Sequence, residues 1–296
     1  MTIRTVLPQG ASAATNNGYG VTEMELTDAT SRFVDLDGMR VHLRRTGTGP
    51  TLVLLHGSGA SLHVFDAVTD LLADRFDVVR PDLPGFGLTG PRPDRDYSVG
   101  AYVSFLDRLL EPLVPGPFVL AGHSFGGQIA WTYALAHPDR LRGLVLMNAT
   151  GYPDKDIPLA LRLARIPPLR PVLRRLSSRA ATARNLAGLV GPGSTVVDDA
   201  LVDRVHTLTS RPGARDAFID FATTDHPDRS AEIAAIRTPT LVLSSELVSG
   251  QHFGRDIPDS HEVVLPGGGH LMPAEAPAEV SRAIGAFADG LDREDG

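Results

Sequence analysis

The 296-residue sequence contains no cysteine, so disulfides, thiolate metal sites and cysteine nucleophiles are excluded. Positive charge is not in surplus either, because the formal net charge is -7, and this argues against a general nucleic-acid binder. No apolar run approaches the length of a membrane span, and the first residues lack the apolar core of a signal peptide. We therefore expect a cytoplasmic protein without a membrane span.

Signatures of cofactor and metal binding are missing as well. Neither a G-x-G-x-x-G motif nor a P-loop lysine pattern occurs between a strand and a helix, so a nucleotide cofactor is not expected. The ten histidines show no H-E-x-x-H motif or similar clustering, so no metal is expected. The expected partner is a small-molecule substrate.

From Thr51 onward, short apolar runs alternate with helix-patterned segments, which is typical of parallel strands covered on both faces. Two further runs joined at Asp37-Gly38 favour a hairpin at the sheet edge. The prediction is an α/β fold with a doubly wound, mostly parallel, eight-stranded sheet. The apolar runs lie at 52–55, 78–82, 118–121, 144–147, 240–243 and 262–265, and the helices near 61–73, 97–113, 128–137 and 276–287.

One long interruption divides this pattern. About ninety residues separate the run that ends near Met147 from the run that begins near Thr240, which is too many for an ordinary connection. Such an insert covers the edge of the sheet where ligands bind. We interpret residues 152–236 as a helical lid, 23–151 and 237–296 as the core, and the small, polar residues 1–22 as a flexible tail.

The stretch Gly122-His123-Ser124-Phe125-Gly126-Gly127 lies between a predicted strand and a predicted helix. A serine in such a tight turn has an exposed hydroxyl, and the flanking glycines remove side chains that would collide there. Ser124 is therefore the candidate nucleophile. The alternative is a serine that only caps the helix.

Two glycine-rich turns follow other strands. His56-Gly57-Ser58-Gly59 leaves backbone amides free to bind an oxyanion, and the expected donors are the N–H groups of Ser58 and Phe125. Pro266-Gly267-Gly268-Gly269-His270 follows the last strand and makes His270 the candidate general base. The alternatives are a plain strand exit for the first turn and a structural histidine for the second.

Together these motifs resemble the α/β-hydrolase-fold serine hydrolases that carry a helical lid. The resemblance runs from about Val34 to Phe287 and also includes Asp82-Leu83-Pro84-Gly85-Phe86-Gly87 and Ala136-His137-Pro138-Asp139-Arg140. It implies hydrolysis through an acyl-enzyme. The family also contains carbon–carbon bond hydrolases and members without hydrolytic activity.

The resemblance implies a triad acid just beyond the strand before the last. In this sequence that position falls near Val248 and holds no carboxylate. Glu246 is the nearest replacement, and Asn148 could orient the imidazole by a neutral hydrogen bond. Loss of the acid's function can cost about four orders of magnitude in rate. A Ser–His dyad and an inactive remnant remain open, and the weaker acid candidates are Asp154, Asp156 and Asp256.

The predicted lid is rich in arginine. Between Ile157 and Val197 there is no acidic residue, whereas seven arginines occur: Arg162, Arg165, Arg170, Arg174, Arg175, Arg179 and Arg184. One interpretation is a set of solvated helix faces. The other is a surface for an anionic partner, such as an anionic substrate group or a carrier-bound acyl chain.

The leading hypothesis is a hydrolase that resembles carboxylic-ester hydrolases and cleaves an ester, lactone or thioester of a small, mostly apolar molecule. The alternatives are a non-hydrolytic relative with a degenerate triad (a cyclase, a lyase or a ligand binder) and a carbon–carbon bond hydrolase. We expect a monomer or a homodimer. The residues expected to line the substrate site are Gly57, His123, Tyr152, Phe218 and Phe221.

Overall fold

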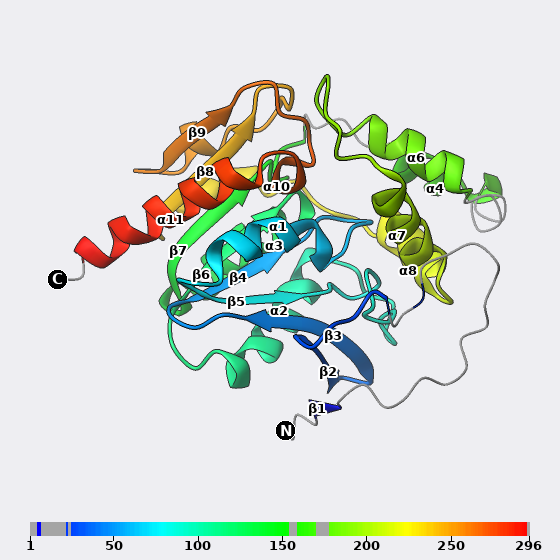
Figure 1. Ribbon diagram of the computed structural model, residues 1–296, viewed down its shortest axis with the longest axis horizontal. Coiled ribbons are helices and arrows are strands. Elements are labelled where there is room, and N and C mark those ends of the chain that lie inside the picture. The colour runs from blue at the N-terminus through cyan, green and yellow to red at the C-terminus, as the bar shows by residue number, and fades with distance from the viewer. Residues whose placement is uncertain (1–4, 7–21, 23–24, 154–158, 170–177, 295–296) are drawn as a thin grey trace.

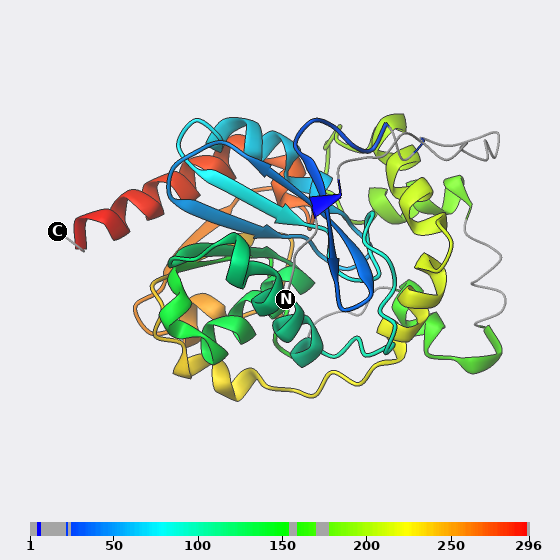
Figure 2. The same cartoon turned by 90° about the horizontal axis from the view of Figure 1, so that it is seen from below.

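The computed structural model describes residues 5–6, 22, 25–153, 159–169 and 178–294, and at its centre lies a twisted sheet with helices on both faces (Figures 1 and 2). Within these residues the strand order is β1-β2-β3-β5-β4-β6-β7-β8-β9. The eight strands β2 to β9 confirm the predicted sheet, and the two-residue β1 adds a short ninth strand to its edge.

The first three strands are antiparallel, and β4 to β9 run parallel to one another. The predicted hairpin is confirmed, because Leu36 pairs with Met39 and both Asp37 and Gly38 have positive φ, as a tight primed turn requires. The strands are β1 (Thr5–Val6), β2 (Ser31–Leu36), β3 (Met39–Thr46), β4 (Thr51–Leu55), β5 (Asp77–Pro81), β6 (Phe118–His123), β7 (Leu141–Met147), β8 (Thr240–Ser245) and β9 (His261–Leu265).

The helices of the core form one layer on each side of the sheet. One layer contains α1 (Asp66–Leu72), α10 (Met272–Glu275) and α11 (Pro277–Glu294), with the short 3-10 helix η1 (Leu62–Phe65) before α1. The other contains α2 (Val99–Leu113) and α3 (Phe125–Ala136). The remaining short helices of the core are η2 (Pro138–Arg140) and α9 (Phe253–Asp256).

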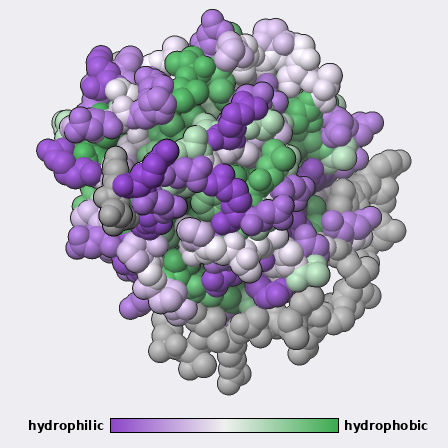
Figure 3. Space-filling model, turned by 60° about the vertical axis from the view of Figure 1, so that its left-hand side comes forward, coloured by the Kyte–Doolittle hydropathy of each residue, from purple (hydrophilic) through white to green (hydrophobic). Residues whose placement is uncertain are grey.

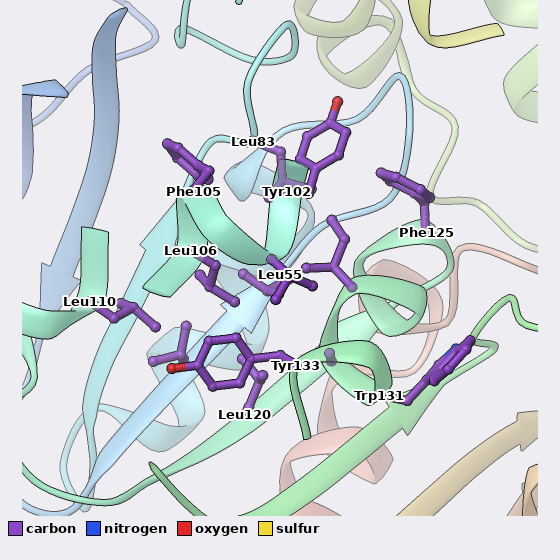
Figure 4. Packing of buried hydrophobic residues seen from close by; sticks show 14 of the residues in the cluster. Leu55, Leu83, Tyr102, Phe105, Leu106, Leu110, Leu120, Phe125, Trp131 and Tyr133 are labelled. Atoms are coloured by element: carbon purple, nitrogen blue, oxygen red, sulfur yellow. The ribbon is translucent and has the colours of Figure 1, made fainter. Parts of the chain in front are cut away.

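Aromatic side chains from α2 and α3 fill the core beside the sheet (Figure 4). Phe125 packs edge-on against Tyr102, with ring centroids 5.1 Å apart. Trp131 and Tyr133 are fully buried in the same cluster. Burial of side chains of this size stabilises the fold by about 1.5–3 kcal/mol each, so the start of α3, where Ser124 lies, is held on a rigid support.

Between β7 and β8 the chain forms the inserted helices α4 (Leu159–Ala164), η3 (Pro167–Leu169), α6 (Arg179–Ala187), α7 (Asp199–Ser210), α8 (Ala214–Thr223) and η4 (Ser230–Ala235). We call residues 159–169 and 178–236 the insert. The helices α4 to α8 gather at one end of the sheet, at the right of Figure 1. The boundaries expected for a lid, residues 152 and 236, stay a prediction.

The surface shown in Figure 3 mixes polar residues with small, separate apolar patches. Among the described helices, none combines the length and the apolar character that a membrane span requires.

Candidate active site

Ser124 lies at the turn from β6 into α3 with φ 55° and ψ -118°, a backbone conformation that L-residues rarely adopt. The turn is possible because two glycines bring backbones into contact. A Cβ on Gly122 would lie 2.3 Å from Gly126 O, and a Cβ on Gly126 would lie 2.3 Å from Leu55 O. The strained serine and its glycines are the geometry expected of a nucleophile turn.

His270 lies in the loop between β9 and α10, and its Nε2 is 2.9 Å from Ser124 Oγ. The structure therefore brings together the two side chains that the sequence predicted as nucleophile and base. The carbonyl of His270 is also fixed, because His123 Nε2 donates to it over 2.6 Å. His123 thus lies at the site, as expected, and contacts the His270 backbone.

The loop after β4 is held by the buried His56. Its Nδ1 donates to Gly57 O over 2.8 Å, and its Nε2 accepts from Leu83 N over 2.9 Å. Burial lowers the pKa of His56, so the ring is neutral and its tautomer is fixed by these two contacts. Because the peptide is trans, the N–H of Ser58 points away from the His56 ring.

Phe125 supplies the other expected oxyanion donor. It is the first residue of α3, so its N–H has no acceptor within the helix. Gly57 brings the two loops together, since a Cβ at this position would lie 3.0 Å from Ser124 Cβ. The assignment of Ser58 and Phe125 as oxyanion donors stays a prediction.

Asp82, at the end of β5, organises the loops behind the site. Its carboxylate accepts from Leu62 N, Leu88 N and the Nδ1 of His42, each over 2.8 Å. Burial alone would raise the pKa of Asp82, but the hydrogen bond and the charge of His42 hold it well below its usual value. Asp82 is therefore an ionised anchor for loop structure.

Glu246 does not make the expected contact with the His270 ring. Its side chain is exposed, and its Oε2 accepts from Gly267 N over 3.0 Å, three residues before His270. The glutamate therefore anchors the backbone of the His270 loop instead of the imidazole. The reason is positional: Glu246 follows the last residue of β8, beside the start of the loop that leaves β9.

The side chain of Asn148 also contacts the backbone of the His270 loop and not the imidazole ring. Its Oδ1 accepts from Ser245 N over 2.8 Å, and its Nδ2 donates to Ser245 Oγ at 2.9 Å, to Gly269 O at 3.1 Å and to His270 O at 3.3 Å. Ser245 Oγ itself donates to Gly269 O over 2.7 Å. Asn148 and Ser245 together form a buried polar clamp on the loop that carries the base.

Of the weaker acid candidates, the structure describes Asp256, and its carboxylate contacts residues other than His270. Asp256 accepts from Tyr152 Oη over 2.9 Å and pairs with Arg255, which lowers the pKa of this aspartate. Asp154 and Asp156 lie outside the described residues.

A cavity of about 260 Å³ opens beside Ser124 and His270. One wall comes from the loop after β4, and the opposite wall from α6, α7 and the chain between them. Its apolar lining residues are Ala60, Val64, Leu186, Leu189, Val196, Leu201, Val205, Leu271 and Ala274, and its other lining residues are Gly57, Ser58, Gly59, Ser61, His63, His123, Ser124, Asp198, Arg204 and His270. The insert therefore helps to enclose the candidate catalytic pair.

Three of the expected lining residues pack elsewhere. Tyr152 lies against His252 and Phe253, and Phe221 packs between Phe86 and Phe125. Phe218 packs against the core cluster. Phe221 is buried, and Tyr152 and Phe218 are partly buried against the same core cluster, so the apolar surface of these large rings is covered by the core and not by the cavity. Gly57 and His123 do line the cavity, as expected.

Of the arginines in the acid-free stretch, Arg179 is paired with acidic residues that lie just beyond that stretch. Arg179 pairs with Asp199 and Asp203 of α7, each over 2.5 Å. Arg165 donates to Ala222 O over 2.9 Å. Arg170, Arg174 and Arg175 lie outside the described residues.

Sequence reasoning missed the lining residue Arg204, whose Nη1 is 3.2 Å from Asp66 Oδ2. Arg204 lies outside the acid-free stretch and is preceded by Asp198, Asp199 and Asp203, so its charge did not stand out. Ser245 and Glu275 were also missed, because nothing in their local sequence indicates contacts with a distant loop. In the described part of the chain no His, Asp and Glu side chains cluster as a metal would require, and the absence of a metal or cofactor stays a prediction.

Comparisons with known proteins agree with this fold. The family model described as alpha/beta hydrolase fold matches residues 50–277. An uncharacterised hydrolase, YugF, of Bacillus subtilis is 28% identical over 89% of this chain and 99% of its own. The 2-hydroxy-6-oxononadienedioate/2-hydroxy-6-oxononatrienedioate hydrolase of Burkholderia vietnamiensis is 31% identical over 75% of this chain and 81% of its own. A thermophilic esterase from Thermogutta terrifontis has a similar structure, with a TM-score of 0.72 and 29% identity, covering 86% of this chain and 94% of its own.

Proposed function

The chain belongs to the α/β-hydrolase fold family and is a hydrolase, and we propose that it cleaves an ester, lactone or thioester of a small, mostly apolar molecule through an acyl-enzyme on Ser124. The observation that carries this proposal is the 2.9 Å contact between Ser124 Oγ and His270 Nε2 in the wall of the cavity. A hydroxyl at hydrogen-bond distance from an imidazole can be deprotonated as it attacks a carbonyl.

In the proposed reaction Ser124 Oγ forms a bond to the carbonyl carbon while its proton passes to His270 Nε2. The N–H groups of Ser58 and Phe125 bind the oxyanion, which is the interaction that strengthens most as charge develops. His270 then gives the proton to the leaving group as the bond to that group breaks. In the second half, His270 takes a proton from water as the water oxygen attacks the acyl carbon. The bond between the acyl carbon and Ser124 Oγ then breaks, the carboxylic acid is released, and His270 returns the proton to Ser124 Oγ.

The cavity supports a small substrate with an apolar body. Its volume, about 260 Å³, lies near the lower end of the range for small-molecule sites. Leucine and valine side chains of α6 and α7 face the catalytic loops across it, which suits an acyl or alkyl chain.

A carboxylate on the substrate is the second element of the proposal. Among the described lining residues, Arg204 carries the fixed positive charge. Its partner Asp66 also accepts from Arg80 Nη1 over 2.7 Å and contacts Arg44 Nη1 at 3.4 Å, so one carboxylate is shared by three guanidinium groups. Arg44 also pairs with Asp28 at 3.0 Å, so two carboxylates serve three guanidinium groups in this cluster. Asp198 lines the cavity too, but its Oδ1 accepts from Leu201 N at the start of α7. Arg204 is therefore the side chain in the cavity wall that we propose for an anionic group.

Arg204 also favours a second candidate function, carbon–carbon bond hydrolysis. The relative from Burkholderia vietnamiensis is named for dioate substrates, which carry two carboxylates. The same serine, histidine and oxyanion donors serve such a reaction when the leaving group is a carbon atom. A carboxylate-bearing substrate is common to both candidates.

The proposal is tested by steady-state hydrolysis of p-nitrophenyl acetate, butyrate and hexanoate. The wild type should turn over at least one of these esters, and Ser124→Ala and His270→Ala should each lose about three orders of magnitude or more in kcat. Ser260→Ala, a serine on the turn before β9, serves as the matched control. A folded wild type that leaves all esters intact, or a Ser124→Ala variant with full activity, contradicts covalent catalysis at Ser124.

The carboxylate is tested with a pair of esters that differ only in a terminal carboxylate, such as the mono-p-nitrophenyl ester of succinate and p-nitrophenyl butyrate. Arg204→Gln should raise KM for the anionic ester about tenfold and leave KM for the neutral ester within about twofold. Arg204→Lys keeps the charge and should show a smaller effect. Equal changes for both esters would rule out a role of Arg204 in charge recognition.

A further inference from the structure

The backbone N–H of His270 is held by the insert and not by the core. It donates to Leu189 O over 2.6 Å, and the next amide, Leu271 N, contacts the same oxygen at 3.3 Å. Leu189 lies just after α6, in the turn formed by residues 188–191. The candidate base therefore depends on two supports, since its carbonyl is bound by His123 and Asn148 from the core.

Two glycines let the 188–191 turn approach the His270 loop at backbone distance. A Cβ on Gly191 would lie 2.2 Å from Gly267 O, and a Cβ on Gly269 would lie 2.3 Å from Gly191 N. Distances this short leave no room for any side chain, so both positions require glycine for contact rather than for flexibility. The two backbones fit together only when the turn is fully seated.

A carboxylate on the far side of the histidine completes the contact. Glu275, the last residue of α10, accepts from Gly191 N through Oε1 over 2.7 Å. Its Oε2 is buried and has no hydrogen-bond partner among the described residues, so the bond from Gly191 N is the one that the Glu275 carboxylate accepts within them. The chain on both sides of His270 thus binds the same turn.

Apolar packing reinforces the polar contacts. Leu271, the neighbour of His270, is buried in a cluster with Leu186 of α6 and Val202 of α7, against which Leu189 and Val190 pack. This cluster is separate from the main core. A side chain adjacent to the candidate base therefore belongs to the hydrophobic core of the insert.

We propose that the 188–191 turn positions His270 for catalysis, with Gly191 and Glu275 as positioning residues that seat the turn on the His270 loop. The proposal rests on the proposed function and adds that proton transfer from Ser124 requires the insert to be in place. Neither residue touches substrate; both act through the backbone of His270. A misplacement of about 1 Å at a reacting group can cost about a hundredfold in rate.

The test measures the rate at which a small fluorophosphonate labels Ser124, because this reaction needs the Ser124–His270 pair but little of the substrate cavity. Gly191→Ala should label about a hundredfold more slowly than the wild type at 25 °C. Gly188→Ala is the matched control in the same turn, because Gly188 is exposed with φ -76° and a Cβ there would have its nearest neighbour at 3.5 Å. The rate at which the probe labels Gly188→Ala should be within about twofold of the wild-type rate.

Glu275 supplies a second, independent test in case Gly191→Ala does not fold. Glu275→Ala removes the acceptor for Gly191 N and should slow labelling about tenfold, whereas Glu275→Gln keeps an acceptor oxygen and should restore most of the rate. This rescue distinguishes positioning from a general loss of stability, since all rates are measured on folded protein below its unfolding transition.

The outcomes separate this inference from the proposed function. If the wild type itself is not labelled, the activated serine is refuted and the proposed function fails. If the wild type is labelled and both Gly191→Ala and Glu275→Ala react at the same rate as the wild type, the positioning role of the turn is refuted while the proposed function stands. Slow labelling of Glu275→Gln, equal to that of Glu275→Ala, would also contradict the role of the Gly191 contact.

Discussion

Replacing Asn148 with aspartate should destabilise the protein and slow the enzyme, although the change adds a carboxylate close to the candidate base. Ser245 N is a donor, so its 2.8 Å contact identifies the oxygen of the Asn148 amide and turns Nδ2 toward Gly269 O and His270 O. An aspartate would place a second oxygen against these two carbonyl oxygens. Two attractive contacts would become repulsive.

The magnitude follows from burial. Asn148 is 5% exposed, and removing the donor from a buried acceptor costs about 1–3 kcal/mol, whereas an unpaired buried charge costs about 3–5 kcal/mol. We expect Asn148→Asp to lose about 3–5 kcal/mol of unfolding free energy at pH 8. The substitution should add no backbone strain of its own, because φ at this position is 41° and both Asn and Asp adopt the left-handed region more readily than Ala.

Urea unfolding of the wild type and Asn148→Asp between pH 5 and pH 8 tests this reasoning. The carbonyl oxygens and burial should raise the pKa of the new carboxyl in the folded protein. The folded state then binds more protons than the unfolded state between about pH 4 and the raised pKa, so the deficit should grow as the pH rises. A variant as stable as the wild type at pH 8, with equal or higher activity, would refute this account of Asn148.

Three further predictions concern single residues near the site. Gly57→Ala should lower kcat about tenfold with little change in the thermal midpoint, because the new Cβ lies 3.0 Å from Ser124 Cβ. The control is Gly90→Ala, whose new Cβ meets no atom within 4 Å. Equal kcat values for the two variants would contradict the proposed steric contact with Ser124. Burial lowers the pKa of His63 from 6.5 to about 4, so this group's contribution to stability is present above pH 6.5 and is lost as the pH falls toward 4. In His63→Gln the unfolding free energy, measured with urea, should fall by about 3 kcal/mol less than in the wild type between pH 6.5 and pH 4. An equal fall in both proteins would contradict the assignment. Glu246→Gln should keep kcat within about twofold of the wild-type value, because the glutamine oxygen still accepts from Gly267 N. A loss of about four orders of magnitude in the rate of ester hydrolysis would instead identify Glu246 as the triad acid.

The parts of the site that depend on local backbone geometry were predictable from the sequence. Ser124 and its flanking glycines form one tight turn, and the order of residues within the turn determines its shape. His270 was predictable for a related reason, since parallel strands bring the loops at their carboxyl ends to one edge of the sheet. The sheet itself followed from the alternation of buried runs and amphipathic segments.

The groups that hold His270 in place were not predictable, because they act on its backbone. The sequence suggests Glu246 and Asn148 as partners for the imidazole. In the structure Glu246 accepts from the amide of Gly267, and Asn148 donates to the carbonyl oxygens of Gly269 and His270. Residue type indicates that a side chain can donate or accept, but not which end of a distant loop it meets. The same limit applies to Glu275, whose partner Gly191 is 84 positions away in the sequence.

The cavity walls were the least predictable feature. Tyr152, Phe218 and Phe221 were expected there because aromatic residues are common in apolar sites, but in the structure they pack with other residues of the core. The wall opposite the loop after β4 is formed instead by leucines and valines of α6, α7 and the chain between them, whose packing depends on how the insert docks on the core.

The central claim is that His270 activates Ser124, and the most direct measurement is the intact mass of the wild-type protein after exposure to a fluorophosphonate. The account predicts one adduct per chain, mapped by peptide sequencing to Ser124 and absent from Ser124→Ala. It also predicts labelling slower by about three orders of magnitude in His270→Ala. An unlabelled, folded wild type, or labelling that continues at the same rate without His270, would contradict it.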